Sequence, residues 1–296
     1  MPLKGRHHIG ARSLWMPLGV HTSIAGGLHL AVRRAVQLGC DCFQMFGRNP
    51  RTWAVKEASE DEEVLFRKER EEAGLYPVAI HTTYLINLSS PDETVFRKSV
   101  ALFKTELKAA GRLGVEYLVT HLGSSLGRGK EEAFRRVTLA LKDAVQSGLG
   151  LRTMILFENS AGSGDSYGSE LSDIGKVMDE ARKMGLETGL CLDTCHSFAS
   201  GYPMGSVKEV TALIRRVDEE AGLQSLKLIH LNDSKAPSGS NVDRHEHIGK
   251  GMIGGAVLKE ILNRRELRGL PFILETPKKD RSDDVRNLKT VRGMMP

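Results

Sequence analysis

Histidines and carboxylates stand at the ends of short apolar runs along this chain. Apolar runs that alternate with helical patterns are typical of parallel strands buried on both faces, and the carboxyl ends of such strands meet on one rim. A carboxylate or imidazole there is costly to desolvate unless it is paired or bound to a cation, so several converging ones predict a shared divalent metal. The residues concerned are His81, His121, Glu158, Asp193, His230 and Glu275, with His21 as a weaker case.

The segments between these runs predict the fold that would position them. Eight apolar runs alternate with helical patterns, and no internal repeat or linker divides the chain, which indicates a (β/α)8 TIM barrel of the α/β class. A single barrel needs about 250 residues, so 296 residues with 40% hydrophobic content predict one domain over residues 17–296. The expected strands are 17–21, 42–46, 78–81, 117–121, 153–158, 188–193, 226–230 and 271–275.

Residues 1–16 precede the first predicted strand and show no apolar period. We expect them to form a disordered extension, and Met16 is an alternative start of translation. The segment lacks the apolar stretch of a secretion signal, and no part of the chain has the roughly 20 apolar residues needed to cross a bilayer.

The four cysteines form Cys40-x-Cys42 and Cys191-x3-Cys195, spacings that suit neither a disulfide framework nor a paired zinc site. These features predict reduced thiols in a cytoplasmic protein.

The net charge of the chain and the composition of one predicted loop indicate what kind of partner it binds. The formal net charge of +5 favours a polyanionic partner without requiring one. The predicted loop at 47–53 combines Asn49, Arg51 and Trp53, a mixture that suits phosphate contacts and insertion into a gapped base stack. Trp53 alone is also typical of an aromatic that packs against a helix. A long irregular stretch at 232–255 is expected to be functional, because compact domains seldom carry such loops otherwise.

Six segments of the chain together resemble the endonuclease IV (deoxyribonuclease IV) family of apurinic/apyrimidinic endonucleases, over about residues 18–276. The strongest part of the resemblance is Asp193-x2-His196 followed later by Asp243-x-His245. Thr82 departs from it, because better-known members have an acidic residue there. The segments are His81–Leu88, Leu156–Gly162, Cys191–Tyr202, His230–Lys235, Val242–Gly251 and Phe272–Thr276.

The resemblance implies a centre of three zinc ions on the predicted rim. Glu158 would bridge the first two ions, and Cys195 is expected to be a packed thiol. Nitrogen and oxygen ligands without thiolate also suit Mn²⁺ in some of the sites. The implied ligand groups are His81, His121 and Glu158; Glu158 again with Asp193, His230 and Glu275; and His196, Asp243 and His245.

The activity implied by the resemblance belongs to base excision DNA repair. Such an enzyme hydrolyses the phosphodiester 5′ to an abasic site in double-stranded DNA and leaves a 3′-hydroxyl and a 5′-deoxyribose phosphate. Water activated by the metals attacks the phosphorus, so no covalent enzyme intermediate is needed. Glu158 is the expected catalytic residue. Arg51, Tyr84 and Leu85 would intrude at the abasic site, and Asn49 and Trp53 would contribute further DNA contacts.

Two other functions are compatible with parts of the pattern. A metal-dependent sugar isomerase or epimerase would use the quartet Glu158, Asp193, His230 and Glu275, but it would not require the remaining ligands. A DNA-binding module without catalysis would have no need of so many ligands on one rim. We expect a monomer without an obligate protein partner, because no helical segment shows an extra apolar face.

Overall fold

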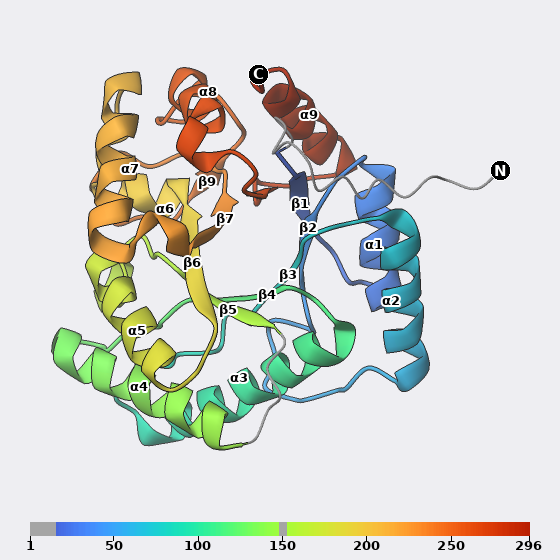
Figure 1. Cartoon of the computed structure of the whole chain (residues 1–296), viewed down its shortest axis with the longest axis vertical. Coiled ribbons are helices and arrows are strands. Elements are labelled where there is room, and N and C mark those ends of the chain that lie inside the picture. The colour runs from blue at the N-terminus through green and yellow to red at the C-terminus, as the bar shows by residue number, and fades with distance from the viewer. Residues whose placement is uncertain (1–15, 148–152) are drawn as a thin grey trace.

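The computed structural model describes residues 16–147 and 153–296. Eight parallel strands close into a barrel in the order β1-β10-β7-β6-β5-β4-β3-β2, surrounded by a ring of helices (Figure 1). The predicted (β/α)8 TIM barrel is therefore confirmed. The barrel strands are β1 (Leu18–Thr22), β2 (Phe43–Phe46), β3 (Val78–His81), β4 (Tyr117–Thr120), β5 (Met154–Glu158), β6 (Thr188–Asp193), β7 (Leu226–His230) and β10 (Phe272–Leu274).

Local signals set the helix boundaries. The helix over Glu60–Ala73 begins after Ser59, whose hydroxyl accepts from the backbone N–H of Glu62 and caps the first turn. It ends at Gly74, whose φ of 64° is favourable only for glycine. The long helices are α1 (Leu28–Gln37), α2 (Glu60–Ala73), α3 (Glu93–Leu113), α4 (Gly129–Gln146), α5 (Leu171–Lys183), α7 (Val207–Ala221), α8 (Gly255–Asn263) and α9 (Arg281–Arg292).

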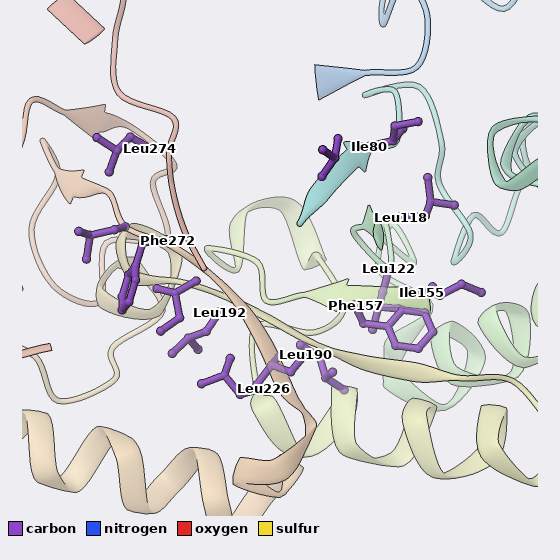
Figure 2. Close-up of a cluster of buried hydrophobic side chains, with 14 of the residues drawn as sticks. Ile80, Leu118, Leu122, Ile155, Phe157, Leu190, Leu192, Leu226, Phe272 and Leu274 are labelled. Carbon is purple, nitrogen blue, oxygen red and sulfur yellow. The ribbon is translucent and has the colours of Figure 1, made fainter. Parts of the chain in front are cut away.

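The apolar core lies on both sides of the barrel wall. Outward-facing side chains such as Ile80, Phe157 and Phe272 pack between the strands and the surrounding helices (Figure 2). Inside the barrel a second cluster forms one layer across neighbouring strands. Because side chains alternate along a strand, this inner layer fixes which residues face inward. Its members are Cys42, Ala79, Val119, Leu156, Cys191, Leu228 and Ile273.

The next inward-facing layer is polar, and we call it the polar layer. Each of its members follows the inner apolar layer by two residues. Six of the eight lie at or just beyond the carboxyl end of their strands, whereas His21 and Gln44 lie within β1 and β2. In β1 the corresponding apolar position is Gly19, where a Cβ atom would collide with the carbonyl oxygen of Cys42. The polar layer consists of His21, Gln44, His81, His121, Glu158, Asp193, His230 and Glu275.

Several small elements were not predicted. A short helix α6 (Thr194–Ala199) directly follows β6, and the stretch predicted as irregular at 232–255 contains an antiparallel ribbon of β8 (Asp233–Ser234) and β9 (His245–Glu246). Single 3-10 turns are η1 (Ser163–Asp165), η2 (Leu223–Ser225) and η3 (Arg265–Leu267).

The two ends of the chain also bear on the predictions. Residues 1–15 of the predicted extension lie outside the described residues, and Met16 is buried in the core. At the other end α9 is a regular helix with a capping box formed by Asp280 and Asp283. Among the helices of residues 16–147 and 153–296, none has the length and apolarity needed to span a bilayer.

Candidate metal centre

Glu158 lies at the centre of the polar layer and contacts several histidines. Its Oε2 atom is 2.9 Å from His81 Nε2 and 3.5 Å from His121 Nε2. Its Oε1 atom is 2.9 Å from His230 Nδ1. The side chain is only 1% exposed, so its charge is compensated by these imidazoles rather than by water. One carboxylate therefore joins two sets of ligand atoms.

The second set combines Glu158 with three strand-end residues. Ligand atoms of Glu158, Asp193, His230 and Glu275 all lie within 4.8 Å of one another. Asn232, which is fully buried, holds two members of this set: its amide donates to Asp193 Oδ2 at 2.6 Å, and its oxygen accepts from the backbone N–H of Glu275 at 2.8 Å. The buried Asp193 carboxylate and the backbone of half-buried Glu275 are thereby positioned before any ligand binds.

The third set lies beside the other two and depends on the small elements. His196 is on α6, and Asp193 caps that helix by accepting the backbone N–H of His196 at 2.7 Å. His245 is on β9, where its Nδ1 atom is hydrogen-bonded to the carbonyl of Glu275 at 3.0 Å. Asp243 Oδ1 is 3.3 Å from His196 Nε2 and 3.4 Å from His245 Nε2. The side chains predicted from the sequence therefore converge.

The ligand atoms fit divalent metal ions. Each of the three predicted groups brings its nitrogen and oxygen atoms within 4.8 Å of one another. The Nε2 atoms of His196 and His245 are buried without a hydrogen-bond partner, which is costly unless another ligand completes the site. Imidazole and carboxylate ligands suit zinc and manganese. Cys191 and Cys195 are close enough to join such groups, but burial raises the pKa of both thiols to about 12.

Two opposing effects set the pKa values in the polar layer. Burial disfavours the charged forms, and attraction between neighbouring imidazoles and carboxylates favours them. Burial raises the pKa of Glu158, but His121 and His230 oppose it, and the result lies well below the usual range. Burial likewise lowers the pKa of His196, but Asp193 and the carboxylates beside it raise the value well above normal. These attractions oppose the cost of burying the charges, except at His121, where burial prevails and lowers the pKa. Because metal ligands must be deprotonated, an ion that binds here would compete with protons for these atoms.

Comparison with known proteins agrees with this geometry. The sequence profile of the family described as "Xylose isomerase-like TIM barrel" matches residues 32–293. A protein named "Probable endonuclease 4" from Cenarchaeum symbiosum is 40% identical over 281 residues, which cover 94% of this chain and 99% of that protein. The crystal structure of endonuclease IV from Thermus thermophilus matches with a TM-score of 0.84 at 35% identity, covering 94% of this chain and 98% of that one. The chain belongs to the endonuclease IV family.

The barrel itself is shared more widely than the endonuclease IV family. A D-tagatose 3-epimerase-like protein matches with a TM-score of 0.71 at 16% identity, over 94% of this chain and 97% of that one. At that identity the similarity concerns the fold alone. The barrel therefore does not distinguish a nuclease from an epimerase, and the side chains must do so.

In this member of the endonuclease IV family the three groups open onto a cavity of about 1360 Å³. Asn49, Arg51 and Tyr84 line that cavity, and Tyr84 is 71% exposed. Leu85 is half-buried. Trp53 is also half-buried and packs against the core, with Lys98 Nζ 6.0 Å from its ring centroid. The DNA contacts of these five residues stay predictions, and they now divide into cavity-lining and packed side chains.

Sequence reasoning missed the residues that hold the ligands. Asn159 directly follows Glu158, and its oxygen accepts the backbone N–H of Asp193 at 2.7 Å. Gln44 occupies the polar layer on β2, where the two-residue alternation could have identified it. Thr82, which departs from the family pattern, is buried, and its carbonyl is hydrogen-bonded to His81 Nδ1 at 2.7 Å. A backbone carbonyl thus orients this imidazole.

Proposed function

We propose that this chain is a zinc-dependent AP endonuclease of base excision repair. It would hydrolyse the phosphodiester 5′ to an abasic site in duplex DNA and leave a 3′-hydroxyl and a 5′-deoxyribose phosphate. The observation that carries the proposal is the set of three adjoining ligand groups in one cavity, two of which share Glu158. The identity to endonuclease IV family members over most of the chain supports the same assignment.

The side chains have distinct roles in this proposal. His81, His121 and the shared Glu158 would hold one zinc ion, and the groups around Asp193 and Asp243 would hold two more. Zinc ions held there would activate a water for in-line attack on phosphorus and stabilise the charge that develops on the departing 3′ oxygen. Mn²⁺ would suit the same nitrogen and oxygen ligands. Asn159 holds the backbone of Asp193 and Asn232 holds its carboxylate, so little reorganisation is needed when the phosphate enters.

Binding of DNA would use the rest of the cavity wall. Arg51, Arg244 and Lys278 line the cavity and offer positive charge to phosphates. Tyr84 presents an exposed ring beside them, and Leu85 follows it in the chain. A base-free sugar leaves a gap in the stack that such side chains can fill, and its low cost of extrusion from the duplex would favour abasic sites. Asn49 at the cavity and Trp53 beneath the same loop would support these contacts.

A sugar epimerase is the competing assignment. Its active site would need only one or two metals and therefore only some of the candidate ligands. The quartet of Glu158, Asp193, His230 and Glu275 is compatible with that chemistry. His196, Asp243 and His245 have no role in it, yet they form a complete further group at the cavity. The proposed nuclease gives all three groups a function.

One experiment separates the two assignments. Purified protein is analysed for metal content and is then incubated with a duplex that carries a single abasic site, with the matched intact duplex, and with a ketose sugar. The proposal expects close to three zinc-like ions per chain and a single nick on the 5′ side of the lesion. It also expects that chelation abolishes nicking and that added Zn²⁺ restores it. One ion or none in active protein, or sugar epimerisation without nicking, would contradict the proposal.

A further inference from the structure

Two members of the polar layer belong to none of the metal-binding groups. His21 on β1 and Gln44 on β2 are neighbours in the barrel, and the other six members of the layer are candidate ligands. Gln44 is fully buried. A buried amide must satisfy its donors and acceptor within the protein, so its partners indicate what it does.

Gln44 contacts two candidate ligands at once. Its amide nitrogen donates to Glu275 Oε1 at 2.6 Å, and its amide oxygen lies 2.9 Å from His230 Nε2. An ionised carboxylate can only accept, so the amide nitrogen must face Glu275 and the oxygen must face His230. The oxygen can only accept in turn, which places a hydrogen on His230 Nε2. The other ring nitrogen, Nδ1, then faces the ligand group, 2.9 Å from Glu158 Oε1.

His21 secures this orientation of the amide. The second N–H of Gln44 points to His21 Nδ1 at 3.0 Å, and His21 Nδ1 is also 3.5 Å from Glu275 Oε1. The His21 ring packs on Phe46 with the ring centroids 4.5 Å apart, which limits its movement. A flipped amide would place its oxygen against a carboxylate and lose both donated hydrogen bonds. The orientation is therefore fixed from two sides.

We propose that Gln44 is a positioning residue for the second metal-binding group. It fixes His230 in the tautomer that presents Nδ1 to the ion, and it holds Glu275 at the same time. His21 supports Gln44. This assignment rests on the proposed function in so far as a metal ion binds there. It makes that one group, and not the other two, depend on an amide outside the ligand set.

Release of zinc into a chelator tests the assignment. The variant Gln44→Met keeps the length of the side chain and removes its hydrogen bonds. Loss of a partner that orients a metal ligand costs about 10- to 100-fold in metal affinity, so we expect one of the zinc ions to leave about that much faster while the release of the others is unchanged. Exposed Gln37 on α1 provides the matched control, Gln37→Met, which should release zinc like the wild type.

A second variant separates orientation from packing. Gln44→Glu retains an acceptor for His230 Nε2–H but turns a like charge toward Glu275. It should lose the same ion faster than Gln44→Met, although its shape is conserved. Nitrogen-15 NMR of zinc-loaded wild-type protein should find hydrogen on Nε2 of His230, and hydrogen on Nδ1 instead would overturn the assignment. If Gln44 variants do not fold, His21→Phe should show a smaller acceleration for the same ion.

The outcomes distinguish this assignment from the proposed function. A wild-type protein that binds no zinc contradicts both. A wild-type protein that binds three ions, together with variants that release all of them at wild-type rates, contradicts the role of Gln44 alone. Equal acceleration for all three ions would make Gln44 an ordinary core residue and would also overturn the assignment.

Discussion

The metal-binding groups differ in construction from the loops that carry Asn49, Arg51 and Tyr84 at the same cavity, which we call the rim loops. In the groups, side chains that are mostly buried hold one another, with Asp243 as the exposed member. Glu158 is 1% exposed and contacts four histidines. On the rim, Tyr84 is 71% exposed, and Asn49 and Arg51 are exposed beside it. A centre that performs one chemistry gains from preorganisation, whereas a surface that must receive a deformed duplex gains from side chains that can move.

The largest expected effect is on the shared ligand. Glu158→Gln removes a charge that two ligand groups share. Incision of abasic duplex should therefore fall by more than the roughly 100-fold that is typical when a residue that only orients a metal ligand is replaced. Steady-state nicking and metal analysis measure the loss, and circular dichroism should show an unchanged fold. Glu246→Gln on β9, next to His245, is the matched control and should keep its activity. A Glu158→Gln enzyme of normal activity would remove the distinction between a rigid centre and an adaptable rim.

The rim should show an effect on selectivity rather than on metal content. Replacing Tyr84 and Leu85 by Ala should weaken binding to abasic duplex by about 1 to 3 kcal/mol if stacking dominates. Binding to intact duplex should change far less, and the number of bound ions should stay the same. Equilibrium binding to both duplexes measures this. Equal losses on the two duplexes would identify these side chains as ordinary packing residues.

The matched control for that double variant is Tyr76→Ala. Tyr76 is 57% exposed and precedes β3, at the opposite end of the barrel from the cavity. It should bind both duplexes like the wild type. Replacing outlying lysines that touch only phosphates should instead weaken both complexes alike and reduce their dependence on salt.

A buried glutamate under the rim loops predicts a pH dependence. Glu106 on α3 accepts the backbone N–H of Thr83 at 3.2 Å, and burial raises its pKa from 4.5 to about 7. Because the folded pKa exceeds the unfolded one, ionisation costs stability as the pH rises from about 4.5 to about 7. Glu106→Gln keeps an acceptor for Thr83 and should unfold like the wild type at pH 4.5, yet be more stable at pH 8 by about 1 to 3 kcal/mol.

Denaturant unfolding of the two proteins at both pH values measures this difference. Exposed Glu131 on α4 provides the control, because Glu131→Gln should change neither value appreciably. A Glu106→Gln protein that is no more stable at pH 8 than at pH 4.5, relative to the wild type, would mean that the carboxylate is well compensated where it lies. The rim loop would then be anchored as firmly as the ligand groups.

The smallest expected effect concerns the start of the chain. Deleting residues 1–15 should leave incision within about two-fold and the melting temperature unchanged, because terminal segments without an apolar period contribute little to a core. Met16, which is buried, is retained in this variant. Loss of nicking or a clear drop in melting temperature would assign the segment to the DNA-binding surface or to the core.

The ligand groups could be predicted from the sequence because the barrel imposes one rule on all strands. A strand buried on both faces can place a histidine or carboxylate only near its end, as at His81 and Glu158, so residue type and position coincide. Gln44 follows the two-residue alternation but lies inside β2 rather than at its end, and an amide is not a typical metal ligand, so its residue type did not mark it. Its role follows only from the contacts across the barrel.

The short elements that carry the third group could not be predicted from the periodicity of apolar residues. The helix α6 has six residues and the strands β8 and β9 have two each, which is too short for an apolar pattern to repeat. Side-chain direction in the loops was also unpredictable, as Trp53 illustrates by packing against the core although its loop borders the cavity. Loops lack the fixed alternation that made the strand ends predictable.

Asp193 makes the second and third metal-binding groups structurally dependent on each other. One of its carboxylate oxygens starts the helix that carries His196, while the other lies among the atoms of the second group and 3.6 Å from His245 Nε2. A barrel of the epimerase type could therefore not acquire the third group by gaining His196, Asp243 and His245 alone. The epimerase quartet already includes the aspartate at the end of the sixth strand, so the further requirement is the short helix that this aspartate caps and that carries His196. Evolution, or a designer, would have to exchange these parts together.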